Sequence, residues 1–212
     1  MRAAIAFDQP GLTAARNGAG ISVTGAFLVA ESLYAISPAG PLISFDIRIE
    51  IKGKYPSDEP RVFETGGRIP RTIDRHINTD GDCCVTIWED WLVRAYDTSF
   101  AAFLNGPLRE YFLGQYVFER TAKWPFSERP HGSDGLYEAY AEILGIRNRK
   151  KDVTYYLRLL SKDWPRGHWF CPCGSGKRLR HCHRDDLAAL HAKVTPPLAR
   201  RMLRRLDSFR RH

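Results

Sequence analysis

The sequence predicts an α+β fold in which an antiparallel sheet comes first along the chain and helices follow it. Two observations carry this prediction: polar and apolar residues alternate over residues 43–51, and apolar residues recur at spacings of three and four after residue 100. A third observation is a cluster of cysteines and histidines at residues 171–183, which indicates a small metal-bound module.

The segment 43–51 is the clearest strand, because its Ile and Phe residues alternate without a break with Ser, Asp, Arg and Glu. Residues 21–29, which are rich in β-branched side chains, and residues 61–65 predict two more strands. Residues 37–41 contain prolines and a glycine and predict a turn, whereas residues 1–20 predict little regular structure. The first part of the chain is therefore expected to be an antiparallel meander.

Helical periodicity follows the strands. It predicts a helix over residues 100–113, with a break or kink at Gly106-Pro107. A second helix is expected over residues 133–144, with Ser133 as its N-cap, and a third from Asp152 to about residue 160. We expect these helices to pack on one side of the sheet.

The charge is distributed unevenly along the chain. Residues 1–146 hold 14 Lys and Arg against 19 Asp and Glu, whereas residues 147–212 hold 18 against 5. A basic block attracts phosphate, anionic lipid or an acidic protein face. We expect three parts: a sheet-containing domain over residues 1–165, a metal-bound module over 166–185 and a basic helical tail over 186–212.

The composition also bears on the compartment. The longest apolar stretches are far too short to span a membrane, and the N-terminus does not have the pattern of a signal peptide. The cysteines number five and three of them are clustered, which does not indicate a disulfide framework. We therefore expect a cytoplasmic protein without a membrane partner, whose cysteines serve thiol chemistry and metal binding.

One cysteine, Cys84, stands in an informative context. Residues 74–88 read DRHINTDGDCCVTIW, and residues 55–62, upstream, read YPSDEPRV. Together these segments resemble the active-site region of ubiquitin-conjugating enzymes, and the resemblance extends over about residues 20–145. The matching positions are Tyr55, Pro56, Pro60, Val62, Ile77, Asn78, Gly81 and Cys84.

Three positions depart from that family. Glu59 replaces one proline of the Tyr-Pro-x-x-Pro-Pro-x-Val turn, and Trp91 comes about one residue early. His76 stands where the family has the Asn of its His-Pro-Asn triplet. An imidazole can donate a hydrogen bond to an oxyanion, and it can also accept a proton from an incoming nucleophile.

The resemblance implies a meander sheet with helices on one side and a catalytic pair made of Cys84 and His76. Cys84 would receive a ubiquitin-like modifier from a ubiquitin-activating-type enzyme, hold it as a thioester and pass it to a protein target. The carboxylates nearest to Cys84 in the sequence are candidate acid, base or orienting groups: Asp82, Glu89 and Asp90. The family's basic N-terminal helix is not expected here, so the activating enzyme would dock differently.

Two cysteines are adjacent, and the alternation of an extended backbone separates them. Side chains of neighbouring residues then point to opposite sides, so one thiol is expected in the core and the other at the surface. The register with the family selects Cys84 as the exposed thiol and Cys83 as the buried one.

A second motif, CPCGSGKRLRHCH at residues 171–183, resembles the SEC-C zinc motif. The resemblance implies a structural zinc ion held by four protein ligands: Cys171, Cys173, Cys182 and His183. His181 is the alternative histidine, and the family register selects His183. We expect Gly174 and Gly176 to let the chain turn tightly beneath the metal, and we expect so small a module to need its metal to fold.

The final segment carries an apolar stripe between arginines, at Leu198, Met202, Leu206 and Phe209. Two interpretations are open, a helix packed on the domain with a solvated basic face and a helix that binds a partner.

The two resemblances together imply a conjugating enzyme-like protein. The SEC-C motif is mostly bacterial, and conjugating enzymes of this kind in bacteria resemble components of anti-phage defence operons, which implies that setting for the pathway. One alternative is a non-catalytic module of the same fold that binds a modifier or another partner. The other is a zinc-containing protein associated with nucleic acid or the ribosome, based on the basic C-terminal block.

Overall fold

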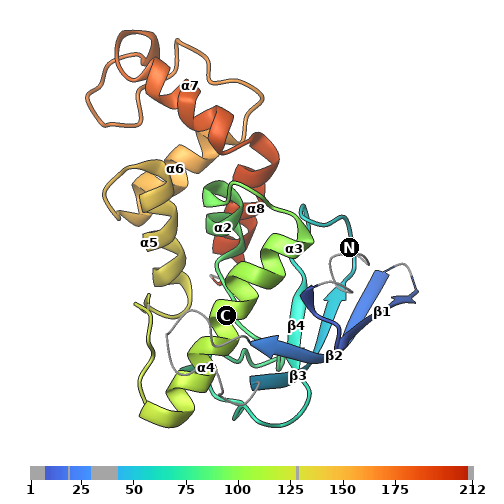
Figure 1. The fold of residues 1–212 in the computed structure, drawn as a ribbon. Coiled ribbons are helices and arrows are strands. Elements are labelled where there is room, and N and C mark those ends of the chain that lie inside the picture. The colour runs from blue at the N-terminus through green and yellow to red at the C-terminus, as the bar shows by residue number, and fades with distance from the viewer. Residues whose placement is uncertain (1–7, 19, 30–42, 128, 210–212) are drawn as a thin grey trace. The chain divides into compact units, whose positions relative to one another are not determined.

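The computed structural model describes residues 8–18, 20–29, 43–127 and 129–209 (Figure 1), so the turn predicted at residues 37–41 lies outside the described residues. The fold is α+β, as predicted. Four strands form one antiparallel sheet in the order β1-β2-β3-β4, and they are β1 (Leu12–Asn17), β2 (Gly20–Val29), β3 (Ile43–Ile51) and β4 (Arg61–Glu64).

The strand at residues 43–51 shows why alternation was informative. Its Ile and Phe residues are buried and its polar residues are exposed or half-buried, and it pairs with both β2 and β4. The expectation of little regular structure in residues 1–20 was wrong, because β1 pairs along its full length with β2, from Leu12 opposite Gly25 to Asn17 opposite Gly20.

The contacts divide the chain into two compact units, which are Met1–Thr86 with Ala95–Glu128, and Ile87–Arg94 with Arg129–His212. The sequence boundaries expected at residues 165 and 185 both fall within the second unit. The first unit contains the sheet together with α3 (Phe100–Phe103), η3 (Leu104–Leu108) and α4 (Arg109–Thr121).

In the first unit, α4 covers one face of the sheet (Figure 1). Phe112 on α4 packs against Phe27 of β2 and Phe45 of β3, with ring centroids 5.5 and 4.8 Å apart. The predicted break is confirmed, because Gly106 has φ −102° and ψ −105° and Pro107 follows it.

The second unit is helical. Its elements are α2 (Trp88–Arg94), α5 (Ser133–Leu144), α6 (Lys150–Leu160), the short turn η4 (Leu179–His181), α7 (Arg184–Lys193) and α8 (Pro196–Ser208). One apolar cluster joins α5, α6, α7 and α8, and it includes Tyr140, Leu157 and Met202. Of the predicted stripe, Met202 and Leu206 lie in this core and Leu198 packs against it, whereas Phe209 is exposed, so most of the stripe favours the packed helix of the two interpretations.

Two predicted helix starts were wrong. Gly132 precedes the first residue of α5 and has φ 72°, so Ser133 is already inside the helix. The next helix, α6, begins at Lys150, and Asp152 lies in its first turn. No helix in the described part of the chain is both long enough and apolar enough to cross a membrane.

Candidate functional sites

The segment that carries Cys84 is a short loop closed on itself by backbone hydrogen bonds. After η2 (Ile73–Arg75), His76 takes a left-handed conformation with φ 50° and ψ 41°. The chain then turns, with Gly81 at φ 83°, and returns so that Ile77 and Cys83 form an antiparallel bridge. The amide of Cys84 donates to the carbonyl of His76 at 2.7 Å, so the structure brings the two predicted site residues together.

The two adjacent cysteines differ as expected. The amide of Cys83 donates to the carbonyl of Val62 in β4 at 2.7 Å, and its side chain is only 6% exposed. Burial raises the pKa of the Cys83 thiol to about 11, so at neutral pH this thiol is protonated and unsuited to nucleophilic attack. Cys84 is exposed to solvent, which an acyl-carrying thiol requires.

Two polar side chains on α4 hold the start of this loop from inside the first unit. The hydroxyl of Tyr111 lies 3.3 Å from the carbonyl oxygens of both Arg75 and His76. Gln115 Nε2 donates to the Arg75 carbonyl at 2.7 Å, and Arg75 Nε donates back to Gln115 Oε1 at 2.8 Å. All three side chains are buried, so these hydrogen bonds fix the backbone that leads into His76.

Sequence reasoning missed this buried network. Burial raises the pKa of Tyr111, so its hydroxyl stays protonated and able to donate. The signal available in the sequence was Gln115, a polar residue on the helix face that also carries Tyr111 and Phe112.

The imidazole of His76 lies against the indole of Trp124, edge to face, with ring centroids 4.6 Å apart. Trp124 is itself fixed, because its Nε1 donates to the carbonyl of Asp74 at 3.0 Å. The ring of His76 is half-buried. The backbone of His76 is hydrogen-bonded to the amide of Cys84, and an imidazole is a group that can donate or accept a proton in acyl transfer.

The three candidate carboxylates have partners of their own. Asp82 forms an ion pair with Arg61 at 2.9 Å, which joins the loop to β4, and Asp90 forms one with Arg94 at 2.6 Å. Glu89 is fully buried in the second unit and accepts from Arg201 at 2.7 Å, Arg205 at 3.1 Å and Tyr140 at 3.0 Å.

The charge state of Glu89 follows from those partners. Burial alone would raise its pKa, but the charges of Arg205 and Arg201 outweigh burial, and the pKa of Glu89 lies below its usual value. Glu89 is therefore an ionised structural group that ties α2 to α8.

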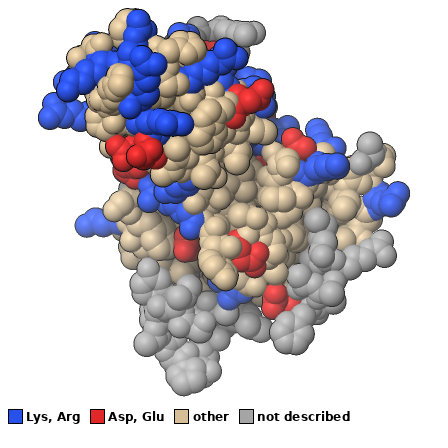
Figure 2. Space-filling model, turned by 90° about the horizontal axis from the view of Figure 1, so that it is seen from above, with Lys and Arg blue, Asp and Glu red and all other residues tan. Residues whose placement is uncertain are grey.

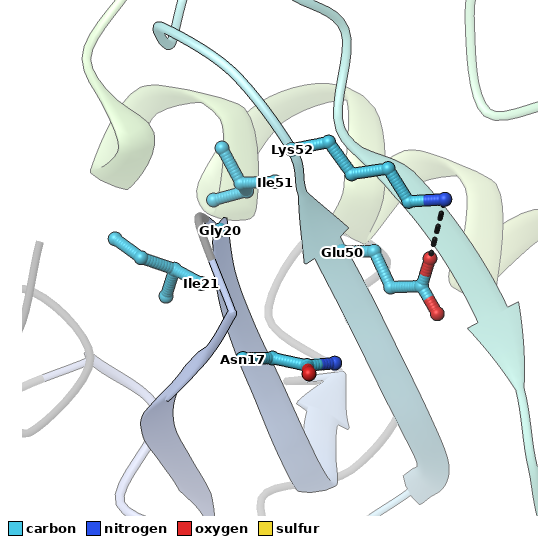
Figure 3. A pocket seen from close by; sticks show the side chains of 6 residues that line it. All are labelled: Asn17, Gly20, Ile21, Glu50, Ile51 and Lys52. Atoms are coloured by element: carbon cyan, nitrogen blue, oxygen red, sulfur yellow. Dashed lines mark ion pairs between the residues drawn. The ribbon is translucent and has the colours of Figure 1, made fainter.

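A hollow of about 350 Å³ lies at one end of the sheet (Figure 3). Its lining is formed by Asn17, Gly20, Ile21, Glu50, Ile51 and Lys52, and Lys52 pairs with Glu50 at 3.7 Å. None of the predicted site residues lines it, so this hollow is not part of the Cys84 site.

The second motif forms a candidate metal centre. The ligand atoms of Cys171, Cys173, Cys182 and His183 all lie within 4.8 Å of one another, so the group can hold a metal ion. The sulfur atoms of Cys173 and Cys182 are 3.6 Å apart, and His183 Nδ1 lies 3.3 Å from the Cys171 sulfur. Tetrahedral ligands with metal–sulfur bonds of about 2.3 Å are separated by about 3.8 Å, close to these distances.

The local backbone explains how the four ligands converge. Gly174 and Gly176 have φ values of 80° and 72°, so both occupy the left-handed region that permits the tight turn. The amide of Cys171 donates to the carbonyl of Lys177 at 2.8 Å and closes the turn. His181 is not part of the group, because its Nε2 accepts from Arg180 at 3.0 Å.

The candidate metal-ligand group is not an isolated appendage. Cys171 and Leu179 are buried in the same apolar cluster as the helices of the second unit, and Cys182 packs against it. The hydrogen bond with Ser175 lowers the pKa of the exposed Cys173 to about 6, whereas burial raises the pKa of Cys171 to about 11. The four candidate ligands therefore range from Cys171, which is buried in the helical core, to Cys173, which is exposed at the surface of the turn.

Comparison with known proteins adds no relative to this description. No protein-family model, no curated protein and no solved structure matches the chain.

Proposed function

We propose that the chain is a ubiquitin-conjugating enzyme-like protein that carries a ubiquitin-like modifier on Cys84 and transfers it to a protein target. The observation that carries the proposal is that the two adjacent cysteines differ in exposure. Cys84 is exposed, and its amide is bonded to the carbonyl of His76, whereas Cys83 is buried. The four-stranded meander followed by helices agrees with the fold that the sequence resemblance implies.

The reaction consists of two acyl transfers. The thiolate of Cys84 attacks the thioester on the activating enzyme, a new carbon–sulfur bond forms, and the activating enzyme's thiolate leaves. An amine or hydroxyl of the target then attacks the Cys84 thioester and expels the Cys84 thiolate. His76 would donate a hydrogen bond to the oxyanion of the second step or accept the proton of the attacking group.

The proposal includes a structural zinc ion at Cys171, Cys173, Cys182 and His183. Three thiolates and an imidazole favour zinc, and four protein ligands leave no open position for catalysis. We place this pathway in bacteria, as part of an anti-phage defence system, because the paired resemblances imply it.

The test is a charging assay with an activating enzyme, its modifier and ATP from the same genome. Wild-type protein is expected to gain an adduct that thiol reagents remove, and Cys84→Ser an adduct that resists them, because an oxyester replaces the thioester. Cys84→Ala should give no adduct, whereas the matched control Cys83→Ala should keep it. An adduct that survives Cys84→Ala contradicts the proposal.

The role of His76 is tested on the preformed thioester. His76→Asn introduces the residue of the family at this position, and the rate of discharge to free lysine or a hydroxyl acceptor is followed. We expect discharge to slow by about 10-fold to 100-fold if His76 takes the proton, since positioned acid–base groups contribute at least that much. An unchanged rate excludes His76 as the proton acceptor, because the Asn amide can donate to an oxyanion but cannot take up this proton.

A further inference from the structure

Apart from the Cys84 site, the second unit displays aromatic side chains among basic ones at its surface. Phe170 and Tyr155 are large rings that remain 54% and 39% exposed. The guanidinium of Arg178 lies over the ring of Phe170 at 4.2 Å from its centroid. Neither the conjugation chemistry nor the metal centre uses these groups, so they need another explanation.

The structure joins these residues into one surface. Tyr155 donates from its hydroxyl to the carbonyl of Phe170 at 3.4 Å, and Phe170 forms a backbone bridge with Arg178. On α6, Lys151 and Arg158 are exposed, and their spacing from Tyr155 places all three on one helix face. We call Lys151, Tyr155, Arg158, Phe170 and Arg178 the aromatic–basic surface.

The position of the aromatic ring is fixed rather than incidental. Phe170 directly precedes the metal-ligand candidate Cys171, whose amide is bonded to Lys177. Arg178 Nη1 donates to the carbonyl of His168 at 2.9 Å, which holds its guanidinium over the ring. Because the Phe170 side chain is already held in one position, it loses little further conformational entropy when a flat partner stacks on it.

We propose that the aromatic–basic surface binds single-stranded nucleic acid, with bases stacked on Phe170 and Tyr155 and phosphates at Lys151, Arg158 and Arg178. Exposed rings interleaved with cations are the arrangement by which proteins hold single strands without reading their sequence. Its setting is basic, since residues 147–212 hold 18 Lys and Arg against 5 Asp and Glu. Figure 2 shows many Lys and Arg side chains on the face that it draws, with several patches of Asp and Glu beside and between them.

The chemistry favours nucleic acid over the other anionic partners. An acidic protein segment would use the cations but not the two exposed rings. An anionic membrane requires a continuous apolar face that enters the acyl boundary beside the cations, whereas the exposed face of α6 next to Tyr155 carries Lys151 and Arg158. Stacking on aromatic rings is available to every base, so we expect binding that tolerates changes of sequence.

The test is fluorescence anisotropy of the full chain, prepared with zinc, against labelled oligouridylate and oligothymidylate of about 15 nucleotides. Three phosphate contacts predict that the logarithm of the binding constant falls with the logarithm of salt concentration with a slope of about −2. Phe170→Ala is expected to weaken binding by about 5-fold to 100-fold, and Phe170→Trp to retain it. Arg158→Ala should reduce the slope by about 0.7.

Matched controls come from the first unit. Tyr96→Ala removes a ring that is fully exposed, and Arg16→Ala removes an exposed cation on β1, and neither should change binding by more than about twofold. Circular dichroism and zinc content show whether Phe170→Ala keeps the fold. The proposal is overturned if neither oligonucleotide binds, if Phe170→Ala binds as the wild type does, or if polyglutamate or phosphatidylglycerol vesicles bind more tightly than both oligonucleotides.

Discussion

At the scale of single residues, the Cys84 loop depends on side chains that never reach the surface. Gln115 and Tyr111 satisfy the carbonyls of Arg75 and His76 from within the first unit. A left-handed residue that is not glycine is uncommon, and His76 adopts that conformation with its backbone held on both sides. Hydrogen bonds from α4 therefore stabilise the backbone of this loop.

The first prediction concerns Gln115. Gln115→Leu keeps a similar volume but leaves the Arg75 carbonyl and Arg75 Nε without this partner in a buried place. We expect the free energy of unfolding to fall by about 1–3 kcal/mol, as measured by urea denaturation. Tyr116→Phe, on the same helix, removes an exposed hydroxyl that accepts from Arg120 and should change it by less than about 0.5 kcal/mol. Equal effects of the two substitutions would contradict a supporting role for Gln115.

At the scale of elements, the sequence predicted best where one face of an element is buried. The alternation over residues 43–51 located β3 correctly, and the glycine and proline at 106–107 located the break before α4. β1 was missed because its residues are mostly exposed, so no apolar pattern marks them and only pairing with β2 makes them a strand. α2 was missed because it is short, and its burial depends on residues far along the chain.

The candidate sites could likewise be predicted where a local sequence pattern marks them, and not where they depend on residues far apart in the sequence. The cysteine and histidine spacing identified the group that can hold a metal ion, and the alternation separated Cys83 from Cys84. The partners of Glu89 could not be predicted, because Arg201 lies 112 residues further along the chain and no local pattern joins them. The network of Tyr111 and Gln115 was equally non-local.

The second prediction concerns the junction of α2 and α8. Glu89→Gln removes the fully buried negative charge that faces the partly buried guanidinium groups of Arg201 and Arg205. We expect the second unit to lose about 3–5 kcal/mol of stability in urea denaturation followed by circular dichroism. Asp90→Asn, whose partner Arg94 is exposed, is the matched control and should cost less than about 1 kcal/mol.

The same carboxylate makes stability depend on pH. The folded pKa of Glu89 lies below its unfolded value of about 4.3, so this stabilisation is present above that value. It is lost as the pH falls through the folded pKa, because the folded state must then take up a proton. Wild-type protein should therefore lose more stability between about pH 5 and pH 3 than Glu89→Gln does; equal losses would contradict the assignment.

At the scale of the whole molecule, the candidate metal centre and the helices share one core. The sequence predicted a separate small module that needs metal to fold. In the structure this segment is not separate, because Cys171 and Leu179 are buried among the residues of α5, α6 and α8. Loss of the proposed zinc ion would loosen the turn and also the surface against which these helices pack.

The third prediction follows from this shared core. Native mass spectrometry should find one zinc ion per chain, and chelation should lower the melting temperature of the helical unit more than that of the sheet unit. At a zinc concentration about 1,000 times its dissociation constant, the stabilisation is about 4 kcal/mol. Cys171→Ser should mimic chelation, whereas His181→Ala, which alters the histidine outside the group, should keep the zinc. Zinc lost from His181→Ala and kept by His183→Ala would reverse the ligand assignment.

The discontinuity of the second unit has a consequence for synthesis on the ribosome. During synthesis, α2 leaves the exit tunnel long before α8 is made. Glu89 can form its ion pairs only after Arg201 and Arg205 have been synthesised, 112 and 116 residues later. The sheet unit can close over α4 in the meantime, because Glu128 ends its last segment. We therefore expect nascent chains released before residue 196 to contain a folded sheet and an α2 that is not packed against its partners. The apolar surface that such chains expose is the kind that chaperones bind.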